Sequence, residues 1–175
     1  QNIVAKSITK AYSKKSFRLN AKSTGDGTLS YKSSNNKIVK VSSLGKVTMK
    51  GYGKVSITIT ASETSKYKLA TKKIILTVKP KKAKLSRVTS SSKETIKITW
   101  KKDKLATGYV VQISNSKRFK KGVLQRYFTK SQKSISVPLK NKSGKKYYVR
   151  IRSYKRVNRV DSYGKWSKTK YIIIK

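Results

Sequence analysis

Residues 31–60 carry the pattern that most constrains how this chain can fold. In the segment YKSSNNKIVKVSSLGKVTMKGYGKVSITIT, apolar residues recur at every second position in three short runs, with lysine, serine and threonine between them. A period of two gives a β-strand one apolar and one polar face. Gly45, Gly51 and Gly53 separate the runs, and glycine readily adopts the positive φ that tight turns need. The segment therefore predicts half of an antiparallel sandwich.

Similar alternations flank this segment on both sides. They lie at residues 17–21 before it and at residues 74–78 after it. The stretch 62–71 between the last two runs is polar, and we expect it to cross over, with Tyr67 and Leu69 as its apolar anchors. The flanking strands complete a first domain.

The second half of the chain repeats the pattern without repeating the sequence. Apolar residues alternate in four further runs, at 96–100, 109–113, 135–139 and 147–151. Long helical periodicity is absent from the whole sequence. Lys79-Pro80-Lys81-Lys82 is typical of a linker, because proline ends strand pairing and lysine favours solvent. We therefore predict one domain over residues 1–79, a linker over 80–82 and a second domain over 83–175.

The first domain resembles the bacterial Ig-like domain, group 2. The resemblance is carried by four motifs: Ser33-Ser34-Asn35, Ile38-Val39-Lys40-Val41, Gly45-Lys46-Val47-Thr48 and Gly53-Lys54-Val55-Ser56-Ile57-Thr58. It covers roughly residues 1–79, and both glycine turns have the expected order and spacing. It implies an extracellular β-sandwich repeat without catalytic residues.

The second domain resembles a fibronectin type III domain. The resemblance is carried by Trp100, Gly108-Tyr109-x-Val111, Tyr147-x-Val149-x-Ile151 and Trp166-Ser167. It implies that Tyr147 is a corner tyrosine, whose hydroxyl bonds back to the main chain. Together the two resemblances predict an all-β chain of two tandem antiparallel Ig-like β-sandwiches, as in surface proteins of clostridial-type Gram-positive bacteria.

Composition argues against most catalytic and metal chemistry. The chain has no cysteine and no histidine, which excludes thiolate chemistry and the usual zinc ligands. The five acids are spread along the sequence, at Asp26, Glu63, Glu94, Asp103 and Asp161. General acid–base catalysis needs a titratable pair, and calcium prefers several clustered carboxylates. We therefore expect no catalytic residue, no metal and no cofactor, and the strand-sized apolar runs predict no membrane insertion.

The charge points to an anionic partner. Lysine and arginine total 46 residues against five acids, a net charge of +41. A surface this basic attracts polyanions, with an affinity that falls steeply with salt. Wall polymers, acidic glycans and nucleic acid all qualify, but the motifs that would confirm nucleic-acid binding are missing. A simpler explanation stays open, namely that lysine only keeps the domains soluble near an anionic envelope.

Arginine and tyrosine gather in one part of the second domain. Six of the eight arginines lie between Arg118 and Arg159, and both residue types are enriched at interface hot spots. If Tyr147, Val149 and Ile151 point inward, the intervening side chains point outward. The predicted ligand-binding residues are Arg126, Tyr127, Tyr148, Arg150, Arg152, Tyr154, Arg156, Arg159 and Tyr163.

The same arginines also fit a structural role. The resemblance to the fibronectin type III domain implies that Trp166 stacks on Arg150 and Arg152 by cation–π contact, as in relatives that carry the tryptophan–serine motif. The sequence leaves open whether this is a ladder alone or a ladder that also forms a binding face.

These observations favour a non-catalytic segment of a secreted or wall-attached bacterial surface protein. Its expected role is that of a spacer and adhesion module, monomeric and located outside the cell or in the cell wall. The expected partner is a host secretory or surface glycoprotein, such as an immunoglobulin, or an anionic polysaccharide. Two alternatives stay open: an accessory module of a larger secreted enzyme, and a generic binder of polyanions such as wall polymer or nucleic acid.

Overall fold

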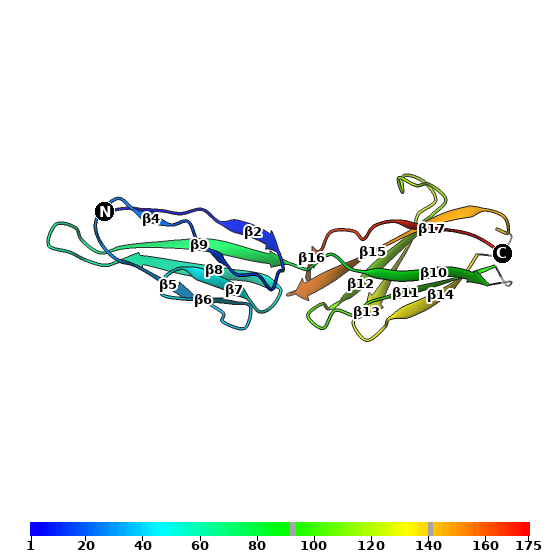
Figure 1. Ribbon diagram of the computed structural model, residues 1–175, viewed down its shortest axis with the longest axis horizontal. Helices are drawn as coiled ribbons and strands as arrows, with labels where there is room; N and C mark the ends of the chain where they lie inside the picture. The colour runs from blue at the N-terminus through cyan, green and yellow to red at the C-terminus, as the bar shows by residue number, and fades with distance from the viewer. Residues whose placement is uncertain (92–93, 140–141) are drawn as a thin grey trace. The chain divides into compact units, whose positions relative to one another are not determined.

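Every regular element in the computed structural model is a β-strand, over the described residues 1–91, 94–139 and 142–175. The chain divides into two compact units, Gln1–Lys79 and Pro80–Lys175 (Figure 1). Each unit packs sheets around its own apolar core. The predicted all-β sandwich class is confirmed.

The first unit contains two main sheets and a short pair of strands. One sheet has the order β2 (Ile8–Ala11), β9 (Ala70–Lys79), β8 (Gly53–Ala61) and β5 (Leu29–Ser33), and its β2–β9 pair is parallel. The other sheet has the order β3 (Phe17–Arg18), β7 (Lys46–Met49) and β6 (Val39–Val41). The separate pair joins β1 (Ile3–Val4) to β4 (Lys22–Ser23).

The alternation in residues 31–60 produces these strands as expected, but it serves both sheets. Val39 and Val47 are buried in one sheet, and Ile57 and Ile59 are buried in the other. Because β7 and β8 are not paired, the chain passes from one sheet to the other between them, through Tyr52. This tyrosine is buried and packs edge-on against Tyr12, with the ring centroids 5.5 Å apart.

The polar stretch after β8 forms a hairpin loop, so the expected crossover is wrong. Strands β8 and β9 are antiparallel neighbours from Gly53↔Val78 to Ala61↔Ala70. The supposed anchors Tyr67 and Leu69 are exposed. Polar contacts hold this loop instead, since the Gln1 side-chain amide donates to the carbonyls of Ser62 and Lys68. A polar stretch between two strands does not show with which strand the second one pairs.

The second unit also has two main sheets. One has the order β10 (Leu85–Ser91), β11 (Thr95–Trp100) and β14 (Ser134–Pro138). The other has the order β13 (Leu124–Thr129), β12 (Gly108–Ser114), β15 (Lys146–Val157) and β16 (Val160–Tyr163), with β17 (Lys170–Ile173) also paired to β15. Trp100, Tyr109 and Phe128 pack together in the core. The Trp100 ring centroid lies 5.5 Å from that of Tyr109 and 5.5 Å from that of Phe128.

Candidate binding face of the second unit

The long strand β15 separates the core from the candidate face. Tyr147, Val149 and Ile151 are buried in the core, whereas Arg150 and Arg152 are half-buried on the opposite side. The predicted alternation along this strand is therefore correct. The face is formed by the outer side of the sheet β13–β12–β15–β16, together with β17.

A continuous cation–π ladder occupies the middle of this face. The Arg150 guanidinium lies 4.0 Å from the Phe119 ring and 4.4 Å from the Trp166 ring. The Arg152 guanidinium lies 4.4 Å from Trp166 and 3.9 Å from Tyr163. Each guanidinium is thus stacked between two rings, and the predicted contacts of Trp166 are confirmed. The sequence does not predict the two outer contacts of the ladder, which are those of Arg150 with Phe119 and of Arg152 with Tyr163.

Hydrogen bonds fix Arg150 from the side. Its Nε donates to Gln112 Oε1 at 2.8 Å, and the Gln112 amide donates to Gln125 Oε1 at 2.7 Å. The Gln125 amide then donates to the Tyr127 hydroxyl at 3.1 Å. Burial, and then the charge of Arg152, lower the pKa of Arg150. A guanidinium held in this way is a structural element of the sheet, with both of its faces covered.

Tyr154 is part of the framework, contrary to prediction. The sequence predicts that it points outward as a binding residue, and the structure buries it with 7% of its surface exposed. Its ring lies against Tyr127 and Tyr163, with centroids 6.1 Å away in each case. It also lies over Gly108, where a Cβ atom would be 2.9 Å from the tyrosine ring. Alternation correctly predicts the side of the sheet on which the Tyr154 side chain lies. It does not show that rings from other strands cover this side chain.

Arg126 lies on the core side of the sheet, so the prediction that it joins the outward-pointing side chains of β15 in one face is wrong. It is directly opposite Val111, which is buried in the core, and opposite residues of an antiparallel pair share a face. Arg126 remains exposed because β13 is an edge strand, and its Nη1 donates to the Gln125 carbonyl.

The two remaining arginines lie at the far end of the β15–β16 hairpin. Arg156 is paired with Asp161, with Nε 2.6 Å from Oδ1 and Nη2 2.8 Å from Oδ2. This pairing lowers the pKa of Asp161, and burial raises the pKa of Tyr163 to about 12. Arg159 occupies the turn with a φ of 65° and is exposed. Arg156 is thus charge-compensated, and Arg159 lies beyond the ladder.

An exposed cluster at the opposite end of the face includes residues that the sequence did not single out. Lys146 Nζ lies 4.1 Å from the Tyr171 ring and 5.8 Å from the Tyr148 ring. The two tyrosines are cross-strand partners on β15 and β17, with centroids 6.4 Å apart. Tyr171 is 60% exposed, and Ile173 beside Lys146 is also exposed. We call Lys146, Tyr148 and Tyr171 the tyrosine–lysine platform.

The platform could not be found without the pairing of β15 with β17. Tyr148 was predicted as a binding residue, but Lys146 and Tyr171 were not. Their contact depends on the register Tyr148↔Tyr171, and no motif in the sequence marks this register.

Four of the acidic side chains hold turns and loops together. Asp26 accepts from Thr64, Glu94 accepts from the N–H groups of Lys142 and Ser143, Asp103 accepts from the N–H of Leu105, and Asp161 pairs with Arg156. Within the described ranges, no three acidic, histidine or cysteine side chains gather as a metal site would require. The same residues include no helix that is long and apolar enough to cross a membrane.

Comparisons with known proteins agree with this architecture. Residues 15–63 match the family of the immunoglobulin-like domain of intimin. The chain is similar in structure to a segment of two fibronectin type III domains from chicken tenascin, with 14% identity, 90% of each chain covered and a TM-score of 0.60. It is also similar to a chain of a cytokine receptor complex, with 11% identity, coverage of 86% of this chain and 88% of that chain, and a TM-score of 0.51. The comparison with curated proteins gave no match. The chain therefore has the fold of tandem immunoglobulin-like and fibronectin type III-like β-sandwiches.

Proposed function

We propose that this chain is a non-catalytic spacer and binding segment of a secreted or wall-attached bacterial surface protein, and that it binds anionic polysaccharide. The match of residues 15–63 to an intimin-type domain supports a surface role. Tandem sandwiches suit a spacer, because each unit is compact and has its own core.

The tyrosine–lysine platform is the observation that carries the binding proposal. Tyr171 exposes an apolar ring beside a half-buried tyrosine and a lysine ammonium. Aromatic rings bury much area at low entropic cost and leave a polar hydroxyl at the edge. A sugar ring can pack on such a surface while its carboxylate, sulfate or phosphate meets Lys146. A host glycoprotein that displays the same acidic sugars would be bound through the same platform.

The positive charge of the rest of the surface strengthens this contact, but it does not select one anionic polymer over another. A net charge of +41 raises the local concentration of any polyanion and accelerates its association. This long-range attraction weakens with ionic strength, because salt screens exposed charges over about 8 Å at about 0.15 M. A contact that also packs a sugar ring on tyrosine should still be formed at a salt concentration that screens the electrostatic attraction.

Binding assays with the full chain test this proposal. Suitable probes are heparin, hyaluronan and wall teichoic acid, with dextran as the neutral control. We expect binding to at least one of the three anionic polymers and none to dextran, with an affinity that decreases with salt but is still measurable at about 0.15 M. Equal binding to all three polymers that disappears at that salt concentration would instead indicate non-specific charge attraction.

A further inference from the structure

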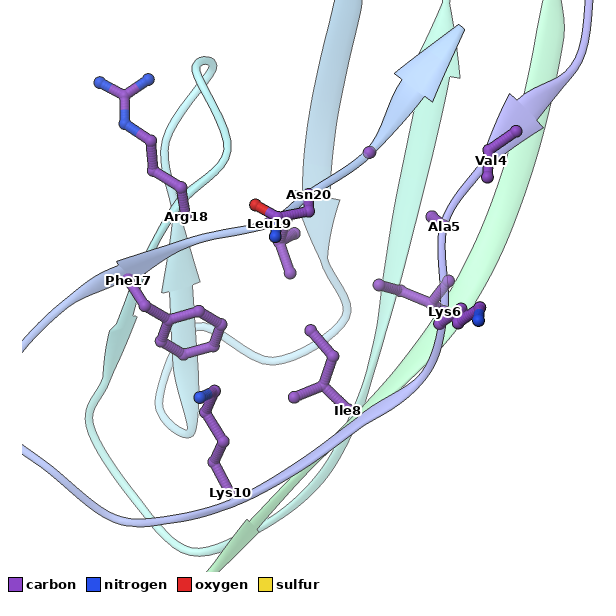
Figure 2. A pocket seen from close by; sticks show the side chains of 11 residues that line it. Val4, Ala5, Lys6, Ile8, Lys10, Phe17, Arg18, Leu19 and Asn20 are labelled. Carbon is purple, nitrogen blue, oxygen red and sulfur yellow. The ribbon is translucent and has the colours of Figure 1, made fainter.

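A groove of about 500 Å³ opens in the first unit, whereas the face described above belongs to the second unit. It lies between residues 4–10 and residues 17–21 (Figure 2). Figure 2 shows the side chains of Ile8, Phe17 and Leu19 projecting into the space between these two segments. This volume lies within the range of about 300–1,000 Å³ that is typical of small-molecule sites.

The topology of the strands creates the groove. The chain pairs with β4 at Val4 and then joins β9 at Ile8, so it changes sheet over residues 5–7. The facing segment changes partner in the same way, from β7 at Arg18 to β1 at Lys22. Both sheets therefore end here in short edge strands.

The inside of the groove is apolar, whereas its polar edge is basic. Apolar lining comes from Val4, Ala5, Ile8, Phe17, Leu19 and Ile74. The charged residues that line it are Lys6, Lys10 and Arg18, all exposed. Lys10 Nζ lies 5.1 Å from the Phe17 ring, at the border between the two zones. No acidic residue is found among the described residues that line the groove.

We infer that this groove binds a single-chain fatty carboxylate. The alkyl chain would replace water along the apolar lining, and the carboxylate would meet the three cations at the edge. A groove of about 500 Å³ has room for one short alkyl chain rather than for the paired chains of a bilayer lipid. Each additional methylene that enters the groove should tighten binding about fourfold. This inference is independent of polysaccharide binding, because the groove and the platform lie in different units.

Titration of the full chain with sodium octanoate and sodium decanoate, below their micelle concentrations, tests the inference. We expect decanoate to bind at least tenfold more tightly than octanoate (about fourfold for each of two methylenes). Amide NMR shifts should be confined to residues 4–10, 17–21 and the neighbourhood of Ile74. Decanol and decyltrimethylammonium have the same chain without the negative charge, and they should bind more weakly.

Two matched variants separate the groove from the general basic surface. The triple substitution Lys6→Gln/Lys10→Gln/Arg18→Gln should weaken decanoate binding about tenfold, from three partly exposed charge contacts. Lys32→Gln/Lys40→Gln/Lys54→Gln removes the same charge from exposed positions outside the groove and should leave the affinity within about twofold. All six positions are exposed, so both variants should fold. Equal weakening by both variants, tighter binding of decyltrimethylammonium, or shifts elsewhere would overturn the inference.

Discussion

Replacement of Trp166 by alanine is expected to lower the free energy of unfolding of the second unit by about 2–4 kcal/mol. Trp166 is the central ring of the ladder, 4.4 Å from both Arg150 and Arg152. Each cation–π contact contributes about 0.5–2 kcal/mol, depending on how far it is removed from water. Its loss also uncovers the sides of the two guanidiniums that the indole covers.

Denaturant unfolding followed by tryptophan fluorescence measures this effect. Both tryptophans of the chain lie in the second unit, so Trp100 in the core remains as the reporter when Trp166 is removed. Trp166→Phe is the matched control, since it keeps a ring between the arginines and should lose less stability. A change below about 0.5 kcal/mol in Trp166→Ala, as for an ordinary surface substitution, would mean that the ladder does not support the fold.

Gly108→Ala should destabilise the second unit by about 3 kcal/mol or more, beyond the usual range for an added core methyl group. A Cβ at this position would lie 2.2 Å from the Phe128 carbonyl oxygen and 2.8 Å from the Tyr154 hydroxyl. The tyrosine could move, but the carbonyl belongs to the paired strand β13. The added methyl group must therefore separate β12 from β13 at the edge of the core.

Gly144→Ala is a suitable control for the glycine effect itself. Gly144 has a φ of 72°, and a Cβ there would meet no atom within 4 Å. Its substitution should lower the free energy of unfolding only by the penalty that alanine pays in the left-handed conformation, about 1–2 kcal/mol. Chemical denaturation of both variants, again read from tryptophan fluorescence, gives the comparison. If Gly108→Ala is no less stable than Gly144→Ala, the close contact between the two strands is not the reason for this glycine.

The sequence predicted most of what depends on local periodicity. Alternation placed Val47, Ile57 and Ile151 in the cores because the side-chain period of a strand is two wherever it pairs. The stacking of Trp166 on Arg150 followed from the same alternation together with a recognised motif.

The features that the sequence did not predict depend on the register between paired strands and on side chains from other strands that cover a residue. The side of the sheet on which Arg126 lies is set by its pairing with Val111, and a shift of one residue would reverse it. Tyr154 is buried because Tyr127 and Tyr163 come from two other strands to cover it. The platform and the groove likewise arise between segments distant in sequence, which no local pattern reports.

The ladder also changes how the candidate site should be tested. An Arg150→Ala/Arg152→Ala double variant would remove two rungs that hold the sheet face together, so loss of binding could reflect loss of structure. The tyrosine–lysine platform is more informative, because Tyr171 and Lys146 are exposed and lie outside the ladder.

The most direct test of the proposed function is to measure how tightly the Lys146→Gln/Tyr171→Ala variant binds anionic polysaccharide. The polysaccharide is the one that binds the unmodified chain, and the affinity is measured at about 0.15 M salt. The matched control is Lys66→Gln/Tyr67→Ala, which removes the same charge and an exposed tyrosine from a loop of the first unit. We predict about tenfold weaker binding for the platform variant, from one aromatic and one charged contact of about 1 kcal/mol each, and nearly unchanged binding for the control. Equal affinities for the two variants would contradict the proposal.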